Sequence, residues 1–171
     1  MDYHSWIFRL AMVVSVMLAT ADKAASDSCY NLAIPASTPN NRFLEIDGGS
    51  VVRDLYTGLD WARCSVGQDW DGGSCTGEAS TFSWQAALEA AVGRDGQWRV
   101  PDLNQLFSIV ELCQWQPAIN GEMFPNTVSG EYWTSSPVNL GRVWSVDFDG
   151  GHESWSNPFD LHYLRLMRIP N

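Results

Sequence analysis

The acidic side chains between positions 147 and 160 are the first candidates for chemistry in this sequence. Asp147 and Asp149 lie two positions apart, so a strand would project both carboxylates from one face. Glu153 and Asp160 follow in the adjoining polar segment. Such oxygen ligands suit Ca²⁺, which takes about six to eight of them. The spacing is not that of a calcium-binding loop, so the alternative is a set of solvated turn residues. Calcium is the one cofactor that the sequence suggests, and otherwise we expect none.

Two histidines in the same region raise the alternative of a metal-dependent enzyme. His152 and Glu153 begin an H-E-x-x-H motif, but Ser156 occupies the position of its second histidine. A zinc site could instead combine His152 and His162 with Glu153 or Asp160, although both histidines could equally be surface loop residues. The nucleophile motif G-x-S-x-G is absent. We therefore expect no enzymatic activity, with the metal-dependent enzyme as the alternative.

The tryptophans divide into two groups by their surroundings. Trp70 and Trp155 lie in polar segments, and we expect them to be exposed platforms that stack on a sugar or a peptide. The alternative is that they cover small clusters beneath loops. Four others fall on helix or strand patterns, where core packing is the expected role: Trp61, Trp84, Trp98 and Trp144.

Arginines and tyrosines extend the candidate binding surface. Arg142 and Arg165 can give paired hydrogen bonds to a ligand carboxylate, or can pair with Asp147 or Asp160 instead. The aromatic residues of one strand edge, beside short polar residues, have the character of a recognition surface: Tyr132, Trp133, Trp144 and Trp155. The predicted ligand-binding residues are Trp70, Tyr132, Arg142, Trp155, Tyr163 and Arg165.

Short strands and two helices must position these side chains. Alternation over residues 143–148 predicts a strand with one buried face, followed by a turn at Asp149-Gly150-Gly151. Other strand patterns cover residues 43–46, 51–54, 59–61 and 98–100.

Each predicted helix has a recognisable start. Ser83 is a suitable N-cap for a helix whose apolar stripe ends at Gly93. Asp102, with Gln105 at the capping-box position, starts a second helix with one apolar face, formed by Leu103, Leu106, Phe107 and Val110. Because strands and helices do not alternate as βαβ units, we predict an α+β domain with an antiparallel sheet. The connecting segments 65–80, 114–131 and 149–162 are expected to form a polar, aromatic ligand face.

The N-terminal residues predict export. Arg9 precedes an apolar run over residues 10–18 that is too short to span a bilayer, and Ala19-Thr20-Ala21 is an A-x-A cleavage site. We predict a signal peptide over 1–21, an extended arm over 22–41 and one domain over 42–171. No second apolar run could insert into a membrane, so we expect a secreted protein of the periplasm or the cell exterior.

The net charge indicates which classes of partner are disfavoured, and the cysteine content indicates the redox compartment. The formal net charge of −10 argues against nucleic acid or another polyanion as a partner. An even number of cysteines in an exported domain predicts two disulfides rather than a metal site. Cys64 and Cys75 flank a Gly-rich loop and are the natural local pair, which leaves Cys29 to join Cys113.

Seven ordered segments from about Gly48 to Arg168 resemble the Lcl C-terminal domain family, bacterial exported domains named for a collagen-like adhesin. They are GLDWARCSVGQDWDGGSCTG, FSWQAALEAA, WRVPDLNQLFSIVE, PAINGEMFPNT, EYWTSSPV, VWSVDFDGG and YLRLMR. The resemblance implies a C-type-lectin-like fold, with two helices packed on a twisted antiparallel sheet, long loops and stapling disulfides.

The same resemblance implies a function in recognition at the cell surface, often of glycans, in attachment. The named adhesin is a trimer that binds sulfated glycosaminoglycans, so a homo-oligomer is implied as well. This chain lacks collagen-like repeats, and its acidity disfavours a sulfated partner. We therefore predict a non-enzymatic module that binds a glycan or a surface protein in adhesion. The alternatives are a structural contact module of a surface assembly and the metal-dependent enzyme.

Overall fold

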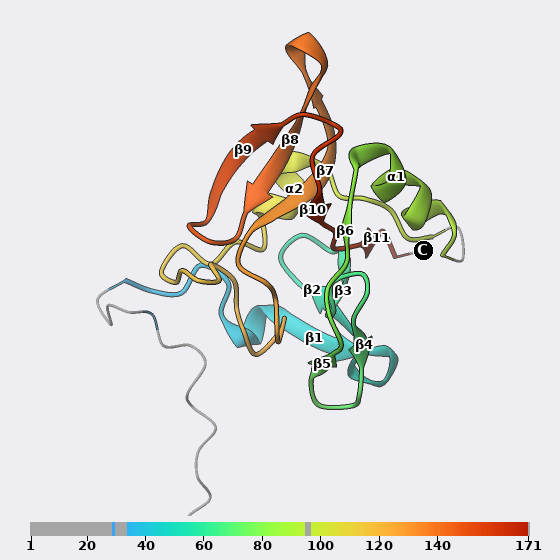
Figure 1. Cartoon of the computed structure of the whole chain (residues 1–171). Helices are drawn as coiled ribbons and strands as arrows, with labels where there is room; N and C mark the ends of the chain where they lie inside the picture. Colours follow the sequence, from blue (N-terminus) through green and yellow to red (C-terminus); the bar gives the residue numbers. More distant parts are fainter. Residues whose placement is uncertain (1–28, 30–33, 95–96, 171) are drawn as a thin grey trace, which may run out of the picture.

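The computed structural model describes residue 29, residues 34–94 and residues 97–170. The predicted signal peptide, with residues 22–28 and 30–33 of the predicted arm, lies outside these ranges. Two sheets dominate the described part, one at the bottom and one at the top of Figure 1, with two α-helices beside the upper sheet. This arrangement confirms the α+β class. No helix within the described ranges is long and apolar enough to cross a membrane.

The lower sheet joins residues from the two ends of the domain. Its strand order is β1-β2-β3-β11, and every pair is antiparallel. Gly48 and Gly49 adopt positive φ and allow the turn between its first two strands. The strands are β1 (Phe43–Ile46), β2 (Val51–Asp54), β3 (Asp60–Ala62) and β11 (Met167–Arg168). The predicted strands 43–46 and 51–54 are confirmed, and the third begins one residue later than predicted.

The upper sheet has the order β6-β10-β7-β8-β9, and only the β10–β7 pair is parallel. The turn at Asp149-Gly150-Gly151 forms as predicted, with Gly151 at a φ of 72°. The residues after it, predicted as a loop, contain a full strand, because β9 pairs with β8 over five residue pairs. The strands are β6 (Thr81–Phe82), β7 (Glu131–Val138), β8 (Arg142–Asp147), β9 (His152–Ser156) and β10 (His162–Tyr163).

Both predicted helices form. Helix α1 (Trp84–Val92) begins after Ser83 and ends before Gly93. Helix α2 (Leu103–Phe107) has the full capping box, with reciprocal bonds of 2.8 Å between Asp102 and Gln105. It is shorter than its apolar pattern predicted, because Val110 lies beyond the helix in a bridge with Ile119. The described ranges also contain three single 3₁₀ turns: η1 (Asn40–Arg42), η2 (Asp47–Gly49) and η3 (Asn139–Gly141).

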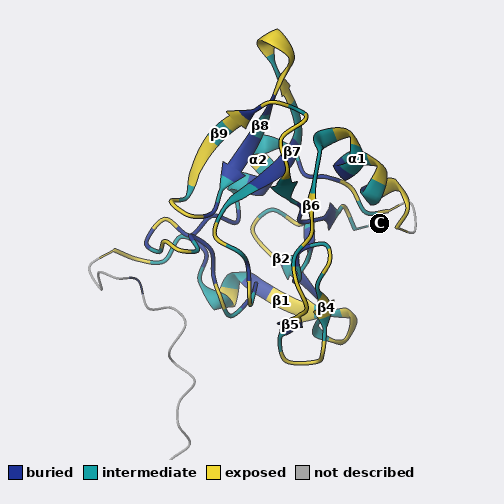
Figure 2. Cartoon of the chain, in the orientation of Figure 1, coloured by how far each residue is buried: buried dark blue, intermediate teal, exposed yellow. Residues whose placement is uncertain are grey.

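Two apolar clusters form the interior. The larger fills the space between α2 and the two sheets, with fully buried Trp61, Leu106 and Phe148 among its members. The smaller lies under α1 and includes Ala87, Trp133 and Leu164. In Figure 2 strand β8 is largely buried while its neighbour β9 is largely exposed. A two-stranded hairpin, β4 (Asp69–Trp70) with β5 (Cys75–Thr76), extends from the lower sheet.

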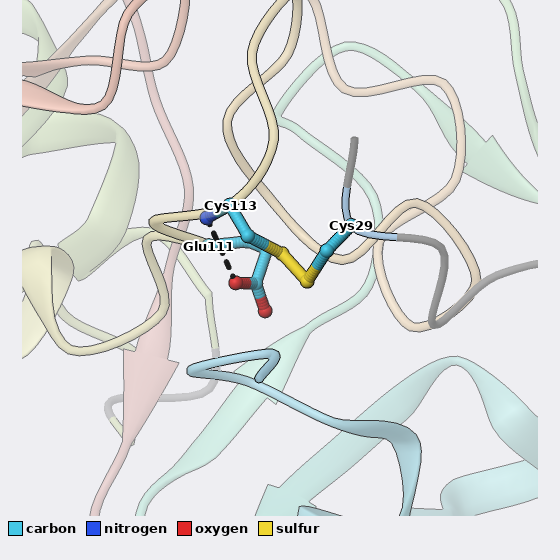
Figure 3. A group of neighbouring side chains, drawn as sticks. All are labelled: Cys29, Glu111 and Cys113. Atoms are coloured by element: carbon cyan, nitrogen blue, oxygen red, sulfur yellow. Dashed lines mark hydrogen bonds between the residues drawn. A yellow bond between two sulfur atoms is a disulfide. The ribbon is translucent and has the colours of Figure 1, made fainter. Parts of the chain in front are cut away.

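Both predicted disulfides are present, Cys64–Cys75 and Cys29–Cys113. The second lies beside the carboxylate of Glu111, as Figure 3 shows. This carboxylate is buried and accepts bonds of 2.8–3.1 Å from the backbone or hydroxyls of Ser37, Thr38 and Cys113. Burial by itself would raise the pKa of Glu111, but these hydrogen bonds outweigh it and hold the pKa below its ordinary value of 4.5. Glu111 thus binds the described end of the arm to the domain.

We expect Glu111→Gln to lower the free energy of unfolding by about 3 kcal/mol, because one amide oxygen cannot satisfy the donors that two carboxylate oxygens satisfy. The exposed residue Glu89 provides the matched control, and Glu89→Gln should change stability by less than about 0.5 kcal/mol. Urea unfolding measures both. Because the folded-state pKa of Glu111 is lowered, its contribution is present above pH 4.5 and is lost as pH falls below that value. A difference between wild type and Glu111→Gln that grew on acidification would contradict this account.

Candidate functional site

A polar hollow of about 330 Å³ lies where the β4–β5 hairpin meets the lower sheet and the segment after Ile119. Three stretches that are distant in sequence form its walls: strand β1, residues 63–73 and residues 121–125. Concave sites with a few converging polar groups and an aromatic wall are where small ligands bind. The lining residues are Glu45, Arg63, Trp70, Gly72, Gly73, Gly121, Glu122 and Pro125.

Trp70 forms the aromatic wall. Its strand is held by pairing with β5 and by the Cys64–Cys75 disulfide. The indole Nε1 donates to the Gly48 carbonyl at 3.2 Å. A Cβ at Gly49 would lie 3.3 Å from the indole, and Gly49 has a φ of 83°, so glycine is the residue that permits this close approach. The sequence predicted Trp70 as an exposed stacking platform, and the structure shows an indole that is half-buried and fixed rather than free.

Arg63 supports the indole from behind. Its guanidinium lies 4.2 Å from the centroid of the Trp70 ring system, a cation–π distance, and the side chain is only 4% exposed. Its Nε donates to the Met123 carbonyl at 2.9 Å, and its terminal nitrogens donate to the carbonyls of Gly49 (3.1 Å) and Glu122 (2.7 Å). One buried cation therefore joins the three walls of the hollow.

Two carboxylates complete the hollow. Glu45 accepts a bond of 2.9 Å from Arg63, yet its side chain stays 54% exposed. Glu122 accepts from the Asn40 amide at 2.9 Å. The hollow thus presents hydrogen-bond acceptors beside an aromatic surface. Sequence reasoning missed Arg63, Glu45 and Glu122, because none belongs to a catalytic or metal-ligand motif and their proximity depends on the tertiary fold.

Arg165 lies inside the protein, not at a ligand surface. It is fully buried and donates to the carbonyls of Ala62 (2.8 Å) and Arg63, and to the hydroxyls of Ser65 (3.3 Å) and Thr127 (2.7 Å). Burial lowers the pKa of Arg165 to about 10, so the group remains a cation at neutral pH. The prediction that it binds a ligand carboxylate, or pairs with an aspartate, is wrong. Through these hydrogen bonds Arg165 instead connects the backbone around Arg63 to Thr127, close in sequence to the walls of the hollow.

The predicted tyrosines are also packed inside. Tyr132 is fully buried, with its hydroxyl 2.9 Å from Ser65 Oγ and its ring against Phe148, so the prediction that it belongs to the ligand-binding surface is wrong. Burial raises the pKa of Tyr132. Tyr163 is half-buried and contacts the Tyr132 ring at a centroid distance of 5.3 Å. Trp133 is fully buried too, and the predicted recognition edge therefore loses two of its four members.

The other two members lie together on the β8–β9 hairpin. Trp144 and Trp155 face each other across the strands, and the Arg142 guanidinium is 3.5 Å from the Trp155 ring centroid. Trp155 is 49% exposed, as predicted, whereas Trp144 is half-buried and not a core residue. This hairpin is at the top of Figure 1 and β4 at the bottom, so the structure separates Trp155 and Arg142 from Trp70.

The structure does not bring the predicted metal ligands together. The Asp147 carboxylate lies 3.7 Å from His152 Nε2, and Asp149 is exposed. Glu153 projects from the opposite face of the sheet. Asp160 accepts a hydrogen bond from the Asn157 backbone within its own turn. In the described ranges, the one group of three potential ligands within 4.8 Å is the cluster of Figure 3, Cys29, Glu111 and Cys113, whose two sulfurs form a disulfide.

His162 has a different neighbour, the carboxylate of Glu131. Its Nε2 lies 3.1 Å from that group, at ion-pair distance but without hydrogen-bond geometry. Glu131 also accepts from Ser145 (3.0 Å) and Ser156 (2.7 Å). Burial would raise the pKa of Glu131, but the serine hydroxyls and the charge of His162 hold it below its ordinary value. The predicted set of His152, Glu153 and His162 is therefore not assembled.

Comparison with known proteins identifies one family. A model of the Lcl C-terminal domain family matches residues 50–168, and this match confirms the resemblance drawn from the sequence. The matched residues include every wall of the hollow except strand β1. No curated protein matches the chain.

We expect Arg165→Lys to lower the free energy of unfolding by about 3 kcal/mol, because an ammonium group cannot span the four acceptors that the guanidinium fork reaches. Arg142→Lys is the matched control on the surface and should cost less than about 1 kcal/mol. Chemical denaturation of the two variants checks this. Equal losses would mean that Arg165 does not hold these segments together.

Proposed function

The chain belongs to the Lcl C-terminal domain family, and we propose that it is a non-enzymatic module that binds a glycan in the hollow beside Trp70. The observation that carries the proposal is the position of that indole, which is fixed by Arg63 and Gly48 and lines the same hollow as Glu45 and Glu122. A pyranose ring has an apolar face that stacks on an aromatic ring and hydroxyls that donate to carboxylate oxygens. The proposed binding needs no cofactor.

The surrounding architecture supports the same function. We propose that the fold is C-type-lectin-like, which agrees with two helices, antiparallel-rich sheets and long segments held by two disulfides. Disulfides indicate an oxidising environment outside the cytosol, and we propose secretion to the periplasm or the cell exterior. The acidity of the chain favours neutral or cationic glycans over sulfated ones.

One observation favours a second candidate, a contact module in a surface assembly. The β7–β8 hairpin extends beyond the upper sheet in Figure 1. At its tip Leu140 is 96% exposed and has a φ of 67°, a backbone conformation that costs energy for leucine. An exposed apolar side chain at a projecting tip suits insertion into a protein partner or a second copy of the chain.

If the tip makes such a contact, Leu140→Asn should abolish it without loss of thermal stability, because asparagine tolerates positive φ. Light scattering of the purified protein would report self-association, and pull-down from surface extracts would report another partner. Val92→Asn is a control at another exposed apolar position. An unchanged assembly in Leu140→Asn would remove the hairpin tip from consideration.

For the glycan site, Trp70→Ala should weaken binding at least about tenfold, or about 1.4 kcal/mol, because it removes the stacking wall. Trp155→Ala removes a partly exposed tryptophan at the far end of the molecule and should leave affinity unchanged. Calorimetry with the strongest ligand from a glycan array measures both, and a thermal melt confirms folding. Glu45→Ala tests the same hollow without touching the indole. Loss of binding in Trp155→Ala alone would place the site on the β8–β9 hairpin instead.

A further inference from the structure

We propose that two copies of the chain form a dimer through the free edge of strand β9, with the two strands antiparallel and centred on Ser154. The upper sheet of one copy would then continue into the upper sheet of the other. The inference does not depend on glycan binding, because β9 and the hollow beside Trp70 lie at opposite ends of the molecule in Figure 1.

Strand β9 has one edge that no described strand occupies. It is the terminal strand of the upper sheet and pairs with β8 on one side. The strand is largely exposed in Figure 2. Its residues His152–Ser156 include no proline and pair with β8 without a register shift, so β9 lacks two of the features that protect edge strands from pairing. Its backbone can therefore accept a further strand.

The sequence of β9 favours one register for pairing with itself. In an antiparallel dimer with a two-fold axis, one residue lies opposite its own copy. Ser154 is the midpoint of the strand, so centring there pairs all five residues of β9. His152 then lies opposite the second copy's Ser156, and Glu153 lies opposite the second copy's Trp155. Centring on Glu153 would instead place two like charges directly opposite each other, which is destabilising.

Two opposite charges near this edge have no ionic partner within the described part of the chain. The Arg142 guanidinium lies 3.5 Å from the centroid of the Trp155 ring, and no carboxylate pairs with it. Glu153 is exposed, and its carboxylate likewise has no described hydrogen bond or ion pair. Glu153 is opposite Val146, four residues along β8 from Arg142, or about 13 Å along the strand direction. The two charges therefore do not meet within one copy.

The dimer brings these charges together. Residues directly opposite on antiparallel strands share a face of the sheet, so the second copy's Glu153 lies on the face of Trp155. It is one strand spacing, about 4.8 Å, from the backbone of the tryptophan that carries the Arg142 guanidinium. The two-fold axis repeats this contact, so each copy contributes one arginine and one glutamate. The interface is self-complementary in charge, although each copy has a net charge of −10.

The proposed interface is small. Two five-residue strands and two charge pairs bury less surface than a standard protein interface, and the net charges of the two copies repel each other. We therefore expect a dissociation constant of about 10 to 100 µM. Sedimentation equilibrium of the purified protein at physiological salt, up to about 1 mM, covers this range.

Charge reversal tests the contact between Arg142 and Glu153. Arg142→Glu and Glu153→Arg each place like charges at both contacts, and each should weaken the dimer at least about tenfold. An equimolar mixture of the two variants has opposite charges at both contacts, so it should form a heterodimer with an affinity within about threefold of wild type. Thermal melts confirm folding, and both side chains are exposed.

Glu78→Arg is the matched control. It makes the same charge change as Glu153→Arg at an exposed position outside β9, and it should not weaken the dimer. Repulsion between the net charges alone would make both variants associate more strongly than wild type. A weaker dimer in Glu153→Arg but not in Glu78→Arg therefore supports the local contact.

Several results would overturn the proposal. A protein that is monomeric at about 1 mM has no such dimer, and a trimer is incompatible with a closed two-fold contact. A mixture of the two charge-reversed variants that fails to associate would show that Arg142 and Glu153 do not pair between copies. A dimer that persists in both single variants but dissociates in Leu140→Asn would place the contact at the β7–β8 hairpin tip. A monomer whose β9 variants lose only a different protein from surface extracts would assign the edge to that partner.

Discussion

Buried guanidinium groups that donate to backbone carbonyls are the interaction on which this structure depends. Arg63 joins three segments around the hollow, and Arg165 joins the chain around Arg63 to Thr127. In the described structure, residues 63–68 and residues 120–128 contain no strand. Their buried backbone carbonyls therefore need hydrogen-bond donors other than those of a neighbouring strand. A guanidinium supplies several donors in one plane, which a hydroxyl or an ammonium group does not. The protein therefore builds fixed walls from chain that has little regular structure.

The other constraints act on the same walls from outside. The Cys64–Cys75 disulfide closes the stretch that carries Trp70, and the Glu111 carboxylate with the Cys29–Cys113 disulfide attaches the segment that precedes η1. The apolar interior supports the same walls, because Met123 and Phe124, from the wall over residues 121–125, belong to the larger apolar cluster. Rigid walls reduce the conformational entropy lost when a ligand binds, and this suits a site whose function is recognition.

Local signals in the sequence predicted much of the fold. Capping residues and apolar stripes predicted both helices. The even number of cysteines in a domain predicted to be exported, with the short loop between Cys64 and Cys75, predicted both disulfides. Alternation in residues 143–148 predicted strand β8 but not which tryptophans it would expose. Strand β9 was missed because its run of polar residues, HESWS, has little strand character, and pairing with β8 overrides that weak preference.

The candidate site shows where sequence reasoning ends. Residue type and a polar context led to the predictions for Trp70 and Trp155, but could not show that only Trp70 lines the hollow. The chain alone also determined the family, the cysteine pairs and the acidity. Only the tertiary structure decided that Glu45, Arg63 and Glu122 meet beside Trp70, while Arg165 is buried. Hydrogen bonds between a side chain and a backbone carbonyl about sixty residues away leave no periodic trace in a sequence, since any residue can provide the carbonyl.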